Sequence, residues 1–275
     1  MSTSCWTKKT AVICGGSAGL GKEFARELGR QQVARLALVA RSLDGLTAVR
    51  EALLSEHRGL QILCLAADLR DKSQLQQVAD QIYAEFGSID LLIQAVGQSD
   101  RGRLADLTDA RLQELIAMNV LTSLHAVQCF APIMQPSGSN LILIGSLASK
   151  FAPRFLGGYA VAKHGLSALA QQARLELAEQ GIHVLLACPG PIARPDAGGR
   201  YDQLTSDQNL PESARRPGGG AKVKGLNATL LVRQILQAAA GKQPQLIRPA
   251  KAQWLVWLSA WAPAWGERLL RRNSG

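Results

Sequence analysis

Residues Thr10 to Gly21 read Thr-Ala-Val-Ile-Cys-Gly-Gly-Ser-Ala-Gly-Leu-Gly, an apolar run that passes directly into a glycine-rich turn. Such a turn between a strand and a helix lets the backbone approach a pyrophosphate, and the free N–H groups at the helix N-terminus favour its negative charge. Glycine turns also occur for packing reasons, so the pattern around this one matters. The residues expected to line the phosphate site are Gly15, Ser17, Gly19, Leu20 and Gly21.

Seven short apolar runs alternate with segments of helical periodicity along the chain. β-Branched and leucine-rich runs without polar alternation are typical of strands buried on both faces. Strand–helix alternation predicts an α/β fold with right-handed crossovers, here a single-domain, Rossmann-type doubly wound sheet of seven parallel strands flanked by helices. The predicted strands are Thr10–Cys14, Arg35–Ala40, Gln61–Ala66, Asp90–Val96, Asn140–Ile144, His183–Ala187 and Gln245–Ile247. The predicted helices are Lys22–Arg30, Leu43–His57, Ser73–Phe86, Arg111–Phe130, Tyr159–Gln180 and Ala228–Ala240.

Composition narrows the function classes. The 275 residues carry a net charge of +10 and are 47% hydrophobic, which allows a sizeable core and favours anionic partners. The basic residues are dispersed and no nucleic-acid motif is present, so we expect no nucleic-acid partner. Five scattered cysteines without a CxxC pair indicate free thiols in a reducing, cytoplasmic setting and no metal site. No secretory signal is recognisable at the N-terminus, and no run of about 18 apolar residues occurs.

The second and third predicted strands end in residues that suit the adenosine half of a dinucleotide. Where NAD-binding folds place an acidic residue, this chain has Arg41 and Ser42. An arginine offers a bidentate partner to a 2′-phosphate, so the cofactor is predicted to be NADP(H); the alternative is an ordinary surface arginine. Asp68, followed by Leu69, is placed to accept a hydrogen bond from the adenine amino group or, equally, to cap the helix that begins near Asp71.

The fifth predicted strand ends at Ser146, and Tyr159 and Lys163 follow on a predicted helix. Residues four apart share one helix face, so the lysine ammonium would lie beside the phenol. A free tyrosine ionises near pH 10, and a neighbouring positive charge lowers that pKa. Tyr159 is therefore predicted to act as general acid or base towards a carbonyl or alcohol, with Ser146 orienting the reacting oxygen.

These residues resemble the classical short-chain dehydrogenases/reductases over at least Thr10 to Pro249. The resemblance rests on the glycine turn Gly15–Gly21, Asp68, Asn119, Ser146, the Tyr159–Lys163 pair and Pro189-Gly190. It implies a tetrad of Asn119, Ser146, Tyr159 and Lys163, in which the asparagine holds a water that connects the lysine to solvent. It also implies nicotinamide contacts from Pro189, Gly190, Lys163 and Tyr159, with Gly97 beside them, and a homodimer or homotetramer. Arg41-Ser42 and Lys163-His164 are similar to the NADP-using, 11β-hydroxysteroid-dehydrogenase-like branch.

Three positions depart from that family pattern. Cys14 stands where a threonine is usual, Gln94-Ala95-Val96-Gly97 replaces Asn-Asn-Ala-Gly, and Arg194 replaces a threonine after Pro-Gly. These positions frame the cofactor and do not transfer protons. We therefore expect an NADP(H)-dependent carbonyl reductase or alcohol dehydrogenase, with a non-catalytic dinucleotide sensor that binds a protein partner as the alternative.

Two segments lie outside the repeating pattern. Residues 196–225, rich in glycine, proline and serine, are predicted to be a substrate lid on the domain formed by residues 1–250. Residues 251–275 form a tryptophan-rich C-terminal extension, in which Trp254, Trp257, Trp261 and Trp265 make one helical stripe broken near Pro263. This stripe suits a membrane surface, a neighbouring subunit or the substrate entrance, and it favours a lipophilic substrate.

Overall fold

The computed structural model describes residues 5–193, 210–211, 214 and 225–273. The predicted lid, apart from four of its residues, and the departure at Arg194 lie outside this part of the chain. The described residues build one sheet of seven parallel strands in the order β3-β2-β1-β4-β5-β6-β7. This order confirms the predicted doubly wound Rossmann-type fold. The strands are β1 Thr10–Cys14, β2 Arg35–Ala40, β3 Gln61–Ala66, β4 Leu91–Gln94, β5 Asn140–Ile144, β6 His183–Pro189 and β7 Gln245–Arg248.

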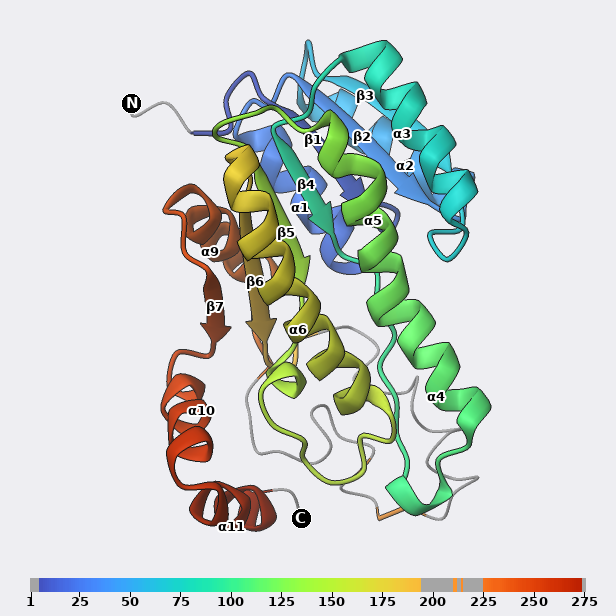
Figure 1. Ribbon diagram of the computed structural model, residues 1–275. Helices are drawn as coiled ribbons and strands as arrows, with labels where there is room; N and C mark the ends of the chain where they lie inside the picture. The colour runs from blue at the N-terminus through green and yellow to red at the C-terminus, as the bar shows by residue number, and fades with distance from the viewer. Residues whose placement is uncertain (1–4, 194–209, 212–213, 215–224, 274–275) are drawn as a thin grey trace.

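Helices cover both faces of the sheet (Figure 1). Buried residues of α1 (Gly19–Arg30), α2 (Leu43–Glu56) and α9 (Ala228–Ala240) pack on one face. Those of α3 (Lys72–Phe86), α5 (Thr122–Phe130) and α6 (Tyr159–Leu177) pack on the other. The apolar runs thus supply two cores, one on each side of a shared sheet, as doubly wound folds require.

The expectation that every strand is buried on both faces is wrong for β3. Four of its residues are half-buried and its two end residues are exposed, because β3 is an edge strand that pairs only with β2. The fourth strand is also shorter than predicted. Asp90 lies before it and uses its side chain to accept hydrogen bonds from Lys9 Nζ, at 2.8 Å, and from the Thr10 N–H, at 2.9 Å.

The predicted helix Arg111–Phe130 is interrupted. It comprises α4 (Asp109–Ile116), a π-helical segment η2 (Ala117–Leu121) and α5. The stretch Asp109–Ile133 passes a length-and-composition test for crossing a membrane. Its buried residues Ala126, Cys129 and Phe130 pack into the core beside the sheet. The apolar side of this stretch therefore belongs to the core of the fold.

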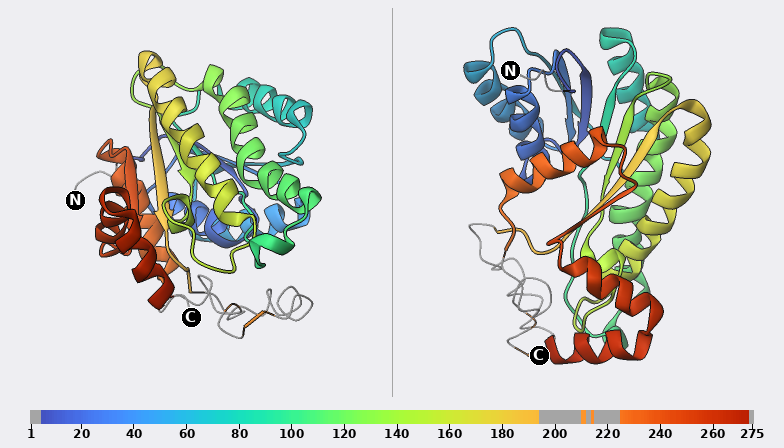
Figure 2. Two further views of the ribbon diagram at one scale, coloured as in Figure 1. Left: turned by 60° about the horizontal axis from the view of Figure 1, so that its bottom comes forward. Right: turned by 90° about the vertical axis from the view of Figure 1, so that its left-hand side faces the viewer.

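All strands are parallel, so their carboxyl ends meet at one edge of the sheet, at the bottom of Figure 1. Helix α6 also begins at this edge. Two further helices, α10 (Ala252–Trp261) and α11 (Pro263–Asn273), follow β7 there, which confirms the predicted break near Pro263. Figure 2 shows them extending beyond the sheet.

Candidate active site

The turn after β1 has the backbone form that a phosphate cradle needs. Gly15 adopts a φ of +91°, in the region that favours glycine. A Cβ on Gly21 would lie 2.0 Å from the Gly15 carbonyl oxygen, so only glycine lets α1 begin this close to the strand. Gly19 is exposed, with no heavy atom within 4 Å of an added Cβ. Ser17 and Leu20 are half-buried beside it. The turn therefore offers open backbone at a helix N-terminus, as a pyrophosphate would require.

At the end of β2, Arg41 and Ser42 are both exposed. The Ser42 hydroxyl caps α2 by accepting a hydrogen bond from the Gly45 N–H at 3.1 Å. A Cβ on Gly45 would lie 3.1 Å from Ser17 Cβ, so this cap adjoins the phosphate turn. In the part of the chain that the structure describes, Arg41 forms no ion pair within 4 Å. Its exposed guanidinium is therefore available to an anion.

The Asp68 carboxylate is bound by Arg70, whose Nε lies 3.0 Å from both carboxylate oxygens. This hydrogen bonding lowers the pKa of Asp68 to about 2, with a smaller contribution from the charge of Arg41. Asp68 does not cap the next helix: the Asp71 side chain accepts from the Ser73 and Gln74 N–H groups. The capping alternative is therefore wrong. The Leu69 side chain is buried in the core, so only its backbone can face a ligand.

Asn119 lies fully buried in the π-helical segment. Its Nδ2 donates to the carbonyl oxygens of Leu115 and Gln98, both at 2.9 Å, and its Oδ1 accepts from the Gln98 N–H at 3.2 Å. Single turns of π-helix occur frequently at functional sites. The Asn119 amide fixes the segment after β4 against the helix, so its first role in this structure is to position that segment.

Ser146 follows β5 and caps a short 3₁₀ turn, η4 (Leu147–Ser149). Its Oγ accepts from the Ala148 N–H at 3.1 Å, and the Ser149 Oγ accepts from the Ser146 N–H at 3.1 Å. The capping box fixes the hydroxyl oxygen of a half-buried side chain. The Ser146 O–H stays available to donate, because the cap uses the oxygen as an acceptor.

Tyr159 is the first residue of α6, and Lys163 lies one turn further on. The Lys163 Nζ is 5.8 Å from the centroid of the Tyr159 ring, as the spacing predicted. Lys163 is only 3% exposed and donates to the Ile144 carbonyl oxygen at 2.9 Å. Burial disfavours the charged ammonium and lowers the pKa of Lys163 from 10.5 to about 8. The side chain therefore titrates much nearer to neutral pH than a free lysine does.

Gly97 connects two of these groups. A Cβ on Gly97 would lie 2.8 Å from Asn119 Oδ1 and 3.1 Å from Lys163 Nζ. The distance between these two polar atoms is therefore no more than 5.9 Å, the sum of the two values. Pro189 ends β6 and Gly190 follows it at the same sheet edge, where the Gly190 N–H donates to the Arg248 carbonyl oxygen at 2.7 Å. The predicted tetrad and the predicted cofactor residues thus gather along the carboxyl ends of the strands.

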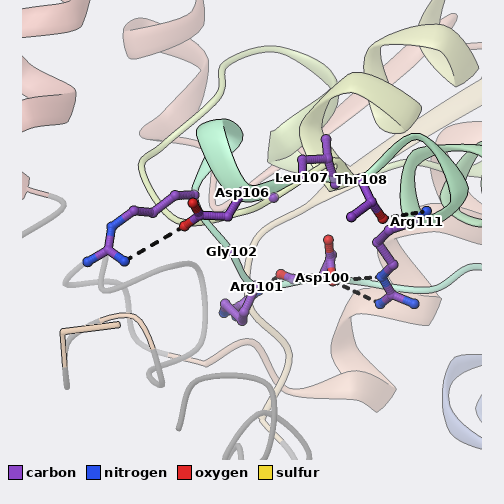
Figure 3. A pocket seen from close by; sticks show the side chains of 9 residues that line it. Asp100, Arg101, Gly102, Asp106, Leu107, Thr108 and Arg111 are labelled. Atoms are coloured by element: carbon purple, nitrogen blue, oxygen red, sulfur yellow. Dashed lines mark hydrogen bonds and ion pairs between the residues drawn. The ribbon is translucent and has the colours of Figure 1, made fainter. Parts of the chain in front are cut away.

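Asp100 is a buried residue that the sequence prediction missed. One carboxylate oxygen accepts from Arg111 Nη2 at 2.8 Å, and the other lies 3.4 Å from the N–H of Gly158, the residue before Tyr159. A Cβ on Gly157 would lie 2.3 Å from that second oxygen. The Asp100–Arg111 pair lines a hollow of about 210 Å³, to which Gly157, two residues before α6, also contributes (Figure 3). Asp100 therefore holds the turn that presents Tyr159.

The departures at Cys14 and Gln94 are adjacent in the sheet, where β1 pairs with β4. Burial raises the pKa of the Cys14 thiol, which makes this thiol a neutral core group. Gln94 is 1% exposed, and neither its amide nitrogen nor its amide oxygen has a hydrogen-bond partner among the described residues. An unpaired buried amide usually costs stability, so Gln94 is a weak point of the core at the cofactor edge.

The sheet order and the glycine turn define a Rossmann-type fold of the dinucleotide-binding class. The family model described as short chain dehydrogenase matches residues 9–203. The chain belongs to the short-chain dehydrogenase/reductase family.

Curated relatives agree with this assignment. A ketoacyl reductase, HetN, from Nostoc sp. is 32% identical over 189 residues, and the match covers 68% of this chain and 65% of the Nostoc protein, just under two thirds of its length. The diacetyl reductase of Staphylococcus epidermidis is 29% identical, with 71% of this chain and 75% of that protein covered. These relatives support a dehydrogenase or reductase activity for this chain.

Solved structures share the fold. A short-chain dehydrogenase/reductase from Serratia marcescens is 27% identical and superposes with a TM-score of 0.72 over 89% of this chain and 97% of that chain. The L-sorbose reductase of Gluconobacter frateurii, solved with NADPH and L-sorbose, is 20% identical and gives a TM-score of 0.75 over 88% and 95% of the two chains. The architecture is therefore that of known family members from end to end of the sheet.

Proposed function

We propose that this protein is an NADP(H)-dependent carbonyl reductase or alcohol dehydrogenase that uses Tyr159 as its general acid or base. The observation that carries the proposal is the placement of Lys163, buried, with its Nζ 5.8 Å from the centre of the Tyr159 ring. A lysine ammonium is rarely buried without a function, because desolvation disfavours its charge. Its charge beside a phenol is what lowers a tyrosine pKa towards neutrality.

Each polar group of the cluster has one task. The Ser146 hydroxyl, fixed by its capping box, donates to the oxygen of the reacting carbonyl. The Tyr159 hydroxyl donates its proton to the same oxygen during reduction and takes it back during oxidation. The Lys163 ammonium stabilises the phenolate that this transfer leaves. Asn119 acts as a positioning residue, because its amide fixes the segment that carries Gly97 beside Lys163.

The residues of the site fit a nicotinamide dinucleotide. The glycine turn between Gly15 and Gly21 leaves the backbone N–H groups at the start of α1 open to a pyrophosphate, and Gly97 leaves room beside Lys163. When bound, the cofactor supplies or accepts the hydride that accompanies the proton transfer. The residues proposed to hold it are Gly15, Ser17, Gly19, Leu20, Gly21, Arg41, Ser42, Asp68, Leu69, Gly97, Tyr159, Lys163, Pro189 and Gly190.

The preference for NADP(H) over NAD(H) rests on Arg41. Arg41 is exposed and directly precedes Ser42, whose cap adjoins the phosphate turn, so its guanidinium would give a 2′-phosphate charge-assisted hydrogen bonds. Asp68 is already neutralised by Arg70, so it gives little repulsion to that phosphate. The same proposal includes a lipophilic ketone or alcohol as substrate and a place in the branch of 11β-hydroxysteroid-dehydrogenase-like proteins. It also includes a homo-oligomeric state and a cytoplasmic location.

Steady-state kinetics with NADPH and NADH, against a panel of short and lipophilic ketones, test this function. We expect NADPH to be preferred, and Arg41→Ala to raise the KM for NADPH by roughly tenfold to a hundredfold with little effect on NADH. A preference for NADH would contradict the Arg41 argument and leave the catalytic proposal standing. Calorimetric NADPH binding without turnover of any ketone would instead favour the non-catalytic sensor.

A further inference from the structure

The two C-terminal helices carry four exposed tryptophans. Helix α10 has the sequence Ala-Gln-Trp-Leu-Val-Trp-Leu-Ser-Ala-Trp, and none of its residues is buried. A short helix that is apolar nearly all round is normally covered by other structure. In Figure 2, α10 and α11 extend past the carboxyl edge of the sheet.

The tryptophans of α10 point away from the fold. Ala252 and Val256 pack against the core beside β7. At 3.6 residues per turn, Trp254, Trp257 and Trp261 lie on the opposite side of the helix. Their side chains are 62%, 59% and 76% exposed, and the rings of Trp257 and Trp261 are 5.9 Å apart. The outer face of α10 is therefore an exposed aromatic surface.

Helix α11 adds positive charge to that surface. Trp265, 63% exposed, lies at the spacing that places it on one helix face with Arg268 and Arg272. The Arg268 guanidinium is 5.6 Å from the centre of the Trp265 ring. The corner between the helices is tightly packed, since a Cβ on Gly266 would lie 2.5 Å from Ser259 Oγ. The two helices therefore pack against each other as one structural unit.

We propose that α10 and α11 form a peripheral anchor that binds an anionic lipid surface. Residues 251–275 contain four basic side chains and one acidic side chain, so the unit carries positive charge in a chain that is itself at +10. Exposed tryptophans beside arginines suit the headgroup boundary, where the indoles meet acyl chains and the guanidiniums meet phosphates. A second copy seated on this face by a two-fold axis would bring like charges together.

The anchor would also orient the candidate active site. Helix α10 follows β7 at the edge of the sheet where α6 begins with Tyr159 (Figure 1). Binding of the outer faces of α10 and α11 to a bilayer would bring that edge close to the lipid. The proposal does not depend on the reductase activity, because its tests measure binding alone.

Tryptophan emission and vesicle co-sedimentation of the whole protein test the anchor. Four of the five tryptophans lie in α10 and α11, and Trp6 is 4% exposed, so emission chiefly reports the anchor. We expect a blue shift and co-sedimentation with vesicles of phosphatidylcholine and phosphatidylglycerol, weakened by salt and much smaller with phosphatidylcholine alone. Equal binding to both kinds of vesicle, or no binding to either, would overturn the proposal.

Two paired variants locate the contact. R268Q/R272Q should weaken binding to the anionic vesicles by roughly thirtyfold, at roughly fivefold to sixfold for each arginine. R50Q/R58Q removes the same amount of positive charge near α2 and should change the affinity for these vesicles little. An equal loss of affinity in the two double variants would mean that the whole basic surface attracts the vesicles, and it would refute the anchor. W257S/W261S should abolish binding while the molar mass in solution stays constant. A fall in molar mass with unchanged vesicle binding would instead make this face an interface between copies.

Discussion

Replacing Lys163 by methionine tests whether burial of the ammonium lowers the free energy of unfolding. Methionine keeps much of the length of the side chain and removes its charge. Burial lowers the pKa of Lys163 from 10.5 to about 8. Between these two values the unfolded chain binds one more proton than the folded chain, so the free energy of unfolding of the wild type rises with pH across that window. The methionine variant has no such proton to bind.

The size of the effect follows from the two pKa values. A pKa difference of one corresponds to about 1.4 kcal/mol, so from about pH 7 to about pH 9.5 the wild type should gain about 2 kcal/mol relative to Lys163→Met. Urea unfolding of both proteins at the two pH values measures this gain. Lys72→Met, at an exposed position of α3, controls for the loss of a surface cation. A stability difference between wild type and variant that does not change with pH would refute the reasoning.

Two other substitutions probe the surroundings of the site. Asp100→Asn should lower kcat by roughly tenfold and leave the KM for NADPH unchanged, because it loosens the turn at Gly158 without touching the cofactor edge. Asp106→Asn, which lines the same hollow at an exposed position, is the control, and equal losses in both variants would contradict a positioning role. Gln94→Met should raise the free energy of unfolding by about 1–3 kcal/mol, since the glutamine amide is buried without a partner. A decrease in thermal or urea stability would mean that the amide is satisfied in solution.

The fold was largely readable from the sequence because buried parallel strands leave a strong signal. The strands β1, β2, β3 and β5 begin and end at their predicted residues. Each is an uninterrupted apolar run between helical segments, and this combination has few other solutions. The edge position of β3 was not readable, since burial on one side or two depends on which strands pair in space.

The contacts of the site were readable from spacing only where one element carries both partners. Tyr159 and Lys163 share a helix turn, so spacing alone predicted their contact. Asp100 lies in a loop and Arg111 in a helix, and their spacing in the sequence does not indicate that they pair. It also does not indicate that Asp100 contacts the turn before Tyr159. The π-helical segment around Asn119 was also invisible, because one extra residue in a helical turn leaves the apolar pattern almost unchanged.

The most direct test of the central claim compares wild type and Tyr159→Phe in NADPH-dependent reduction of the best ketone found in the panel, with NADPH binding measured for both. The substitution removes one hydroxyl and keeps the ring that packs beside Lys163. The account predicts that NADPH binding is retained and that kcat falls by at least about a hundredfold, the range in which positioned proton transfer contributes. Retention of most of the wild-type kcat in Tyr159→Phe would show that another group transfers the proton and would contradict the account.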